Sequence, residues 1–98
     1  MQPIRMYLGT PQTSKLQVFN IPAERRAVMK EIVLTNTENE DVKITLTINT
    51  VDVIKDYIVP ASKTEFIHLS SVLNQNDAVY LQQDKLNAVN VMISGELE

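Results

Sequence analysis

A strict alternation of apolar and polar side chains between residues 42 and 49 limits the possible folds of this chain more than any other feature. The segment reads Val42-Lys43-Ile44-Thr45-Leu46-Thr47-Ile48-Asn49, with every even position apolar and every odd position polar. In an extended chain, successive side chains point to opposite faces, so one face is buried and the other is solvated. A helix would not separate the two kinds of residue. The segment therefore predicts a β-strand, and residues 89–94 repeat the pattern with odd positions facing inward.

Further short runs have the composition of strands, since they are rich in Val, Ile, Tyr, Phe and Thr. They cover residues 4–8, 16–19, 28–35, 53–59, 64–69 and 78–82, and each is bounded by turn residues. No gap between them is long enough for the helical crossover of a parallel sheet. About eight short strands at nearly regular spacing therefore predict an all-β fold, an antiparallel β-sandwich of jelly-roll or immunoglobulin-like type.

Two local features interrupt the strand pattern. Leu69, Val72 and Leu73 have the i, i+3, i+4 spacing of a helix. The run is too short for a free helix, so we predict a single helical turn near residues 69–73 that closes one end of the sandwich. Gly95 ends the alternation near the C-terminus, and we interpret it as a β-bulge or a close approach of backbone.

A turn motif occurs twice, 38 residues apart. Ile21-Pro22-Ala23-Glu24-Arg25 and Val59-Pro60-Ala61-Ser62-Lys63 share an aliphatic residue, Pro-Ala, one spacer and a cation. Proline presets φ for a tight turn and has no N–H to donate to a sheet. Both segments are therefore expected between strands at a sheet edge.

Length and composition favour one folded domain over residues 1–98. The chain has 98 residues, 44% hydrophobic and 21% charged, which is typical of globular proteins and too short for two cores. It contains no Cys and no long apolar run, so a disulfide framework, a thiolate metal site and a membrane span are not predicted. Residues 1–8 carry one Arg and do not resemble a signal peptide. We expect the product to stay in a cytosol-like compartment or to be exported as part of a larger particle.

The charge distribution argues against a nucleic-acid partner. Nine Lys and Arg residues oppose twelve Asp and Glu residues, which gives a net charge of -3. Binding to phosphate backbones needs clustered cations. The largest cluster here is the pair Arg25-Arg26 beside Glu24.

Residues able to support catalysis are scarce, so we predict no enzymatic activity and no cofactor. His68 is the only histidine, and it lies on a predicted strand without a Cys or second His to act with it. We interpret it as a half-buried strand residue or an interface residue. Gly9 and Gly95 are the only glycines, so no Gly-rich loop can surround a phosphate. No catalytic, cofactor-binding or metal-binding residue is assigned.

Some polar and aromatic residues leave a ligand-binding alternative open. Asp52 and Asp56 are an even step apart on one strand, so they share a face, which we interpret as solvated. The acidic segment 38–41 is predicted to be a polar hairpin loop, with a calcium site as the alternative. A carbohydrate-binding surface on Tyr57 or Tyr80 is a further alternative.

Exposed sheet edges are the remaining feature with a functional consequence. An open sandwich leaves edge strands whose N–H and C=O groups must be paired, covered or protected by charge. Few inward charges are available here to protect them. We therefore predict a homo-oligomer, such as a trimer or a ring.

A long segment resembles a recurring part of small structural proteins of tailed phages. It runs Ile21-Pro22-Ala23-Glu24-Arg25-Arg26-Ala27-Val28-Met29-Lys30-Glu31-Ile32-Val33-Leu34-Thr35-Asn36-Thr37, with the Pro-Ala turn before a strand that ends in Leu-Thr-Asn-Thr. Residues 59–77 and 87–95 are similar to later parts of the same pattern. Such proteins often carry Gly where this chain has Glu24 and Asn76, and Asn tolerates the left-handed conformation that Gly supplies.

The resemblance implies a β-sandwich or jelly-roll virion component of a phage tail, connector or head surface. It implies a non-enzymatic structural protein that is assembled in the host cytoplasm, associates with copies of itself and other virion proteins through sheet edges and loops, and resides in the virion. Its motifs are turn and strand signals, so it transfers no site residue. The alternative is a β-sandwich module that binds a glycan or calcium for attachment to a host surface.

Overall fold

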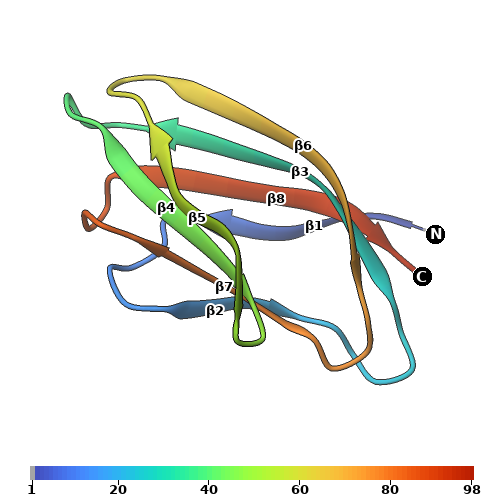
Figure 1. The fold of residues 1–98 in the computed structure, drawn as a ribbon. Coiled ribbons are helices and arrows are strands. Elements are labelled where there is room, and N and C mark those ends of the chain that lie inside the picture. Colours follow the sequence, from blue (N-terminus) through green and yellow to red (C-terminus); the bar gives the residue numbers. More distant parts are fainter. Residues whose placement is uncertain (1) are drawn as a thin grey trace.

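The computed structural model describes residues 2–98, which form eight β-strands and their connections. The strands are β1 (Gln2–Gly9), β2 (Leu16–Asn20), β3 (Ala27–Asn36), β4 (Val42–Ile48), β5 (Val51–Val59), β6 (Thr64–Leu73), β7 (Ala78–Gln83) and β8 (Val89–Leu97). They make two four-stranded sheets (Figure 1), sheet A in the order β1-β8-β3-β6 and sheet B in the order β2-β7-β4-β5. All of the strand pairs are antiparallel. The prediction of an all-β antiparallel sandwich is confirmed.

The strand order identifies the sandwich as a jelly roll. The first half of the chain pairs with the second half strand by strand: β1 with β8, β2 with β7, β3 with β6 and β4 with β5. Successive pairs alternate between sheets A and B, as happens when one long antiparallel hairpin is rolled up. Of the two sandwich types that the sequence left open, the chain therefore adopts the jelly roll.

The core lies between the sheets and follows the predicted alternation. Val42, Ile44 and Leu46 of β4 are buried, and so are the odd-numbered residues 89, 91 and 93 of β8. Strand β3 adds Met29, Ile32 and Leu34 to the same cluster. Burying one such side chain stabilises the fold by roughly 1.5–3 kcal/mol, so these three central strands hold the two sheets together.

The predicted helical turn at residues 69–73 is wrong, because this segment is the second half of strand β6. Leu69 and Leu73 point toward the core while Val72, between them, is 63% exposed, which is the period-two pattern of a strand. The ladder to β3 pairs Val72 with Val28 and Leu73 with Ala27. That neighbouring strand supplies the hydrogen bonds that an isolated turn would have to make internally. No helix is present within residues 2–98.

Gly95 sits at a close approach of two strands, as one of its two interpretations predicted. A Cβ atom at this position would lie 2.1 Å from the Val28 carbonyl oxygen and 2.8 Å from Met6 Cε. The register of β3 against β8 shifts immediately beside it, between Met29 and Glu31. Only glycine lets the β8 backbone come this close to β3.

Both copies of the Pro-Ala motif form the same tight turn between strands. The Arg25 N–H donates to Pro22 O and the Lys63 N–H donates to Pro60 O, each at 3.2 Å. The third residue of each turn is left-handed, with φ of 65° at Glu24 and 57° at Ser62. This combination defines a type II turn, whose third position favours Gly or Asn.

A third turn of this kind precedes β7, where the Asp77 N–H donates to Asn74 O at 3.1 Å and Asn76 has φ 67°. Glu24, Ser62 and Asn76 therefore all have the backbone conformation that glycine favours.

Substituting Gly95 with Ala is expected to lower the free energy of unfolding by about 3 kcal/mol or more, because the new methyl group would overlap backbone atoms of β3. Urea denaturation followed by circular dichroism measures the loss. The matched control is Gly9→Ala, whose Cβ would meet the flexible end of the Tyr7 ring, with an expected loss below about 1 kcal/mol. Equal losses for the two variants would contradict the close approach at Gly95.

Substituting Glu24 with Gly is expected to raise the free energy of unfolding by up to about 1 kcal/mol. A non-glycine residue in the left-handed region costs roughly 1–2 kcal/mol, partly offset by the larger unfolded-state entropy of glycine. Thermal and urea denaturation test this. The control is Ala23→Gly, at a position that is not left-handed, which should lower the stability by roughly 0.5–1 kcal/mol. A destabilising Glu24→Gly substitution would contradict the prediction.

Candidate functional site

Most of the large hydrophobic side chains that are exposed lie on the edge strands β5 and β6. The two strands are the outermost members of sheet B and sheet A, and residues 60–63 join them (Figure 1). Seven large hydrophobic side chains of the described residues are exposed: Leu8, Val51, Val53, Ile58, Phe66, Val72 and Leu86. Five of the seven belong to β5 or β6, and we refer to Val51, Val53, Ile58, Phe66 and Val72 as the β5–β6 flank.

A hydrogen bond ties the two strands of the flank together. The Tyr57 hydroxyl of β5 donates to Glu65 Oε1 of β6 at 3.2 Å. Burial raises the pKa of Tyr57, and the bond to Glu65 raises it further. The Tyr57 ring packs against the core and is half-buried.

The outer face of sheet A carries an apolar row that ends on the flank. Direct cross-strand pairing places Leu8 beside Met92, Met92 beside Val33, and Val33 beside Phe66. The row therefore crosses all four strands of the sheet, from edge strand β1 to edge strand β6. A polar row runs next to it, in which Arg5, Ser94, Glu31 and His68 are paired in the same way.

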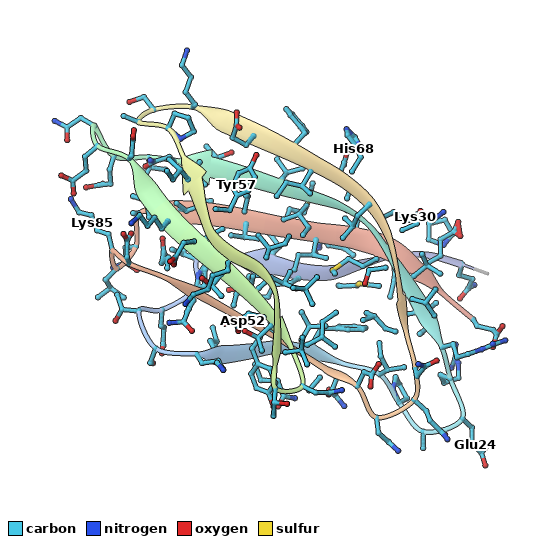
Figure 2. All side chains as sticks on the ribbon, viewed as in Figure 1. Glu24, Lys30, Asp52, Tyr57, His68 and Lys85 are labelled. Atoms are coloured by element: carbon cyan, nitrogen blue, oxygen red, sulfur yellow. The ribbon has the colours of Figure 1, made fainter. Side chains whose placement is uncertain are left out.

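His68 lies on this outer face, on a strand as predicted, and it is more exposed than the half-buried position expected. Its side chain is 74% exposed, and Nδ1 lies 3.5 Å from Glu31 Oε2. Figure 2 shows the ring projecting away from the sandwich. The His68–Glu31 pair is therefore a solvated contact on the outer face of sheet A.

Asp52 and Asp56 lie on the outer face of sheet B, each next to a threonine of β4. The Thr47 hydroxyl donates to Asp52 Oδ1 at 2.7 Å, and the Asp56 N–H donates to Thr45 Oγ1 at 3.1 Å. The predicted sharing of one face is therefore observed, although Asp56 itself has a left-handed φ of 51° and the register of β5 against β4 shifts between the two aspartates. Both aspartates are exposed, which agrees with a solvated face rather than with a catalytic carboxylate pair.

Tyr80, the other aromatic residue considered for a sugar surface, also lies on the outer face of sheet B. Its cross-strand neighbours are Gln17 and Thr47, and Thr47 is paired in turn with Asp52. The ring is half-buried. This row combines an aromatic ring with an amide and a carboxylate.

The acidic loop 38–41 is held by a cation from its own chain. Lys85 Nζ bonds Glu40 Oε1 and lies 3.3 Å from Glu38 Oε1, and these hydrogen bonds raise the pKa of Lys85. Asp41 Oδ1 accepts the Ala61 N–H at 3.0 Å. Within residues 2–98, no group of three or more His, Cys, Asp or Glu side chains is arranged to hold a metal ion. The loop carboxylates thus serve as structural contacts between loops.

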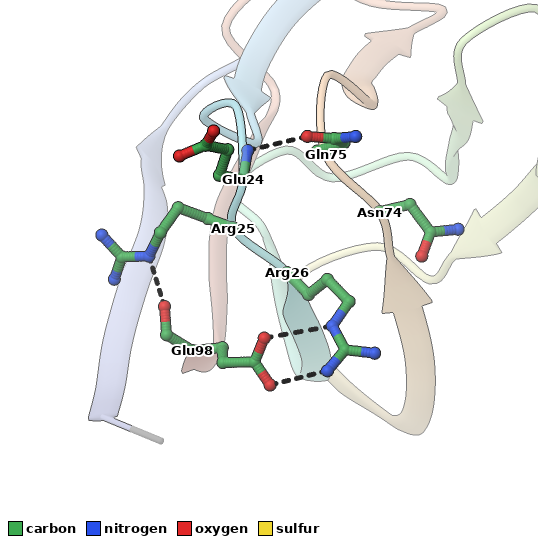
Figure 3. Close-up of a pocket in the computed structure, with 6 residues that line it drawn as sticks. All are labelled: Glu24, Arg25, Arg26, Asn74, Gln75 and Glu98. Carbon is green, nitrogen blue, oxygen red and sulfur yellow. Dashed lines mark hydrogen bonds and ion pairs between the residues drawn. The ribbon is translucent and has the colours of Figure 1, made fainter.

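The basic pair Arg25-Arg26 borders a hollow of about 560 Å³ that Glu24, Asn74, Gln75 and Glu98 complete (Figure 3). Arg26 donates to the Glu98 carboxylate through Nε at 3.1 Å and Nη2 at 2.9 Å. This contact lowers the pKa of Glu98 and raises that of Arg26. Arg25 Nε bonds the main-chain oxygen of Glu98. Both arginines are therefore engaged within the chain.

Two buried amides, Asn36 and Gln83, organise the end of the sandwich where the loops after β3 and β7 lie. Asn36 Nδ2 donates to Glu40 O at 2.8 Å and Val59 O at 2.9 Å, and its Oδ1 accepts the Glu38 N–H. Gln83 Nε2 donates to Pro11 O, and Oε1 accepts the Val89 N–H at 2.9 Å. An amide at a strand end is a weak sequence signal, because most such residues are solvated.

Comparison with known proteins adds no family to these observations. No protein-family model matches the chain, and no curated protein matches its sequence. Within the described residues, no helix is long and apolar enough to cross a membrane.

Substituting Gln83 with Met is expected to lower the free energy of unfolding by about 3 kcal/mol, because Pro11 O and the Val89 N–H would be left buried and unpaired. Urea denaturation measures the change. The matched control is Gln82→Met, a neighbouring, half-exposed residue on the outer face of sheet B, with an expected effect within about 0.5 kcal/mol. A Gln83→Met variant as stable as this control would show that the amide does not hold the loops.

Proposed function

We propose that this protein is a non-enzymatic structural component of a phage or prophage virion, in which jelly-roll subunits associate with copies of themselves and with neighbouring virion proteins. The observation that carries the proposal is the β5–β6 flank. Five of the seven large exposed hydrophobics of the described residues lie on two adjacent edge strands. Exposed apolar side chains on edge strands favour pairing of those strands with another chain.

The turn conformations support the resemblance to phage structural proteins. Glu24 and Asn76, which stand where those proteins often carry Gly, both have left-handed φ. A turn of the same geometry would accommodate Gly at either position without strain. The jelly roll itself recurs in viral capsid domains as well as in lectins, so the fold is compatible with the proposal and does not select it alone.

The polar contacts of the chain favour assembly over catalysis. The carboxylates of Glu38, Glu40 and Asp41 and the guanidinium of Arg26 bind partners within the chain. Asp52 accepts from Thr47 on a solvated face.

A glycan-binding module is the second candidate, and the Gln17–Tyr80–Thr47–Asp52 row on sheet B favours it. Aromatic rings beside hydrogen-bonding side chains suit the apolar faces and hydroxyl groups of sugars. A glycan array probed with the purified protein tests this candidate. Loss of a positive signal in Tyr80→Ala, with Tyr57→Phe as the control, would support it.

Purified virions from the source phage or induced prophage are expected to contain this chain in multiple copies, as measured by quantitative mass spectrometry. In solution, light scattering across micromolar concentrations is expected to show a species larger than the monomer, because unpaired edge strands with exposed apolar side chains favour association. A chain that is absent from the particles would contradict the proposed function whatever its state in solution.

A further inference from the structure

A small polar hollow lies on the outer face of sheet B, where β7, β4 and β5 run side by side. Its volume is about 260 Å³, and it is separate from the hollow beside Arg25 and Arg26. The side chains that line it are all polar, and they come from these three strands and from the loops before β2 and after β7. They include Thr13, Lys43, Thr45, Asp56, Gln82 and Asp84.

The backbone of β5 is distorted so that its aspartates face outward. Strict alternation would place Asp52, Ile54 and Asp56 on one face of the strand, and Ile54 packs against the core. On each side of Ile54, the register against β4 shifts because β5 carries an extra residue, which makes a β-bulge. The two bulges turn both aspartates away from the core, and Figure 1 shows the bend of β5 beside β4.

Asp56, which lines the hollow, has an unusual backbone conformation for a residue in a strand. Its φ is 51°, and the other five left-handed residues within residues 2–98 all lie between strands. A residue other than glycine is strained in this conformation, and such strained residues are concentrated at sites that bind ligands. The bulge and the strain together hold the Asp56 carboxylate at the hollow, next to Thr45.

The polar groups of the hollow have hydrogen-bonding capacity that the chain does not use. Asp84 accepts the Lys43 N–H through Oδ1 at 3.0 Å. The Thr45 hydroxyl accepts the Asp56 N–H at 3.1 Å, and its own proton has only a long contact of 3.5 Å to Asp56 Oδ1. Within residues 2–98, the Lys43 ammonium forms no ion pair, whereas the cations beside the acidic loop and beside Glu98 are paired with carboxylates.

These groups fit a neutral ligand that is rich in hydroxyl groups. A hydroxyl both donates and accepts, so it can donate to the carboxylates of Asp56 and Asp84 and accept from the Lys43 ammonium. Two carboxylates beside one ammonium disfavour an anion. The volume is below the roughly 300–1,000 Å³ of pockets that bury drug-sized ligands, so the ligand is limited to about one ring.

We propose that this hollow binds one ring of a neutral sugar, with Asp56 and Asp84 accepting from its hydroxyl groups and Lys43 and Gln82 donating to them. Gln82 is the cross-strand neighbour of Thr45, so its amide lies across β4 from Asp56. The site is next to the row through Tyr80 but has a different lining. Sugar binding goes beyond the proposed virion role, and either can hold without the other.

A titration with neutral sugars, followed by two-dimensional NMR of the backbone amide signals, tests this site. The probes are glucose, galactose, mannose and N-acetylglucosamine, added separately to the wild-type protein. A single ring that makes few hydrogen bonds is expected to bind with a Kd on the order of 1 mM. The signals of Thr45, Asp56, Gln82 and Asp84 are expected to shift together with at least one sugar. The absence of shifts at these residues with all of the sugars would overturn the proposal.

Two variants test the lining of the hollow. Asp56→Asn keeps the left-handed backbone, which Asn tolerates, and is expected to weaken sugar binding about fivefold, because a hydrogen bond to a charged group is stronger than one to a neutral group. The matched control is Asp52→Asn, on the same strand and also bonded to a threonine of β4, with an expected change below about twofold. Gln82→Ala removes a lining amide without altering the bulge and is also expected to weaken binding about fivefold.

The outcomes separate this inference from its alternatives and from the proposed function. Weakening by Asp52→Asn and Tyr80→Ala, but not by Asp56→Asn or Gln82→Ala, would assign the sugar to the row through Tyr80 and overturn the proposal. Shifts at the hollow with calcium chloride and with no sugar would also overturn it. Sugar binding in the hollow of a chain that is absent from virions would support this inference and contradict the proposed function.

Discussion

Burial of the inward side chains of β3, β4 and β8 between the two sheets is the interaction on which the rest of the structure depends. These strands are central in their sheets and supply most of the buried apolar side chains. Strands β5 and β6 each contribute only their final residue, Val59 and Leu73, to the fully buried set. The exposed apolar residues of β5 and β6 follow from the position of the core. The core buries the inner faces of the central strands and covers the outer strands only in part.

Two buried amides and one lysine keep this two-layer arrangement in place at the end of the sandwich where the loops after β3 and β7 lie. Asn36 and Gln83 are almost completely buried, and each bonds backbone groups of a neighbouring segment that would otherwise be unpaired. Lys85 joins the loop after β7 to the acidic loop before β4. Buried backbone N–H and C=O groups must be paired. At the ends of the strands, these side chains make the hydrogen bonds that a neighbouring strand would otherwise make. Their use in structure explains why the same loops offer few groups for chemistry.

The sequence predicted correctly the features that a single strand determines. It failed for features that depend on contacts with strands remote in the sequence. Alternation at residues 42–49 and 89–94 follows from the pleat of a single strand, so it predicted both the strands and their inward faces. Leu69, Val72 and Leu73 fit a helical spacing by coincidence, and the ladder to β3, which is remote in sequence, determines that they are extended. The bonds of Gln83 to Pro11 and Val89 could not be predicted, because they depend on how the rolled hairpin brings its loops together.

The same distinction applies to the candidate surface. The sequence predicted that sheet edges would be the functional feature, because strand-rich composition with few inward charges is a local property. Which apolar residues lie on an edge depends on strand order, since Phe66 and Val72 become edge residues only when β6 pairs with β3 alone. A protein that leaves its apolar surface on an unprotected edge gains stability by pairing that edge, because association then covers the side chains that a single core cannot reach. In this molecule, the exposed apolar residues of β5 and β6 are the part of the alternating pattern that the single core leaves uncovered.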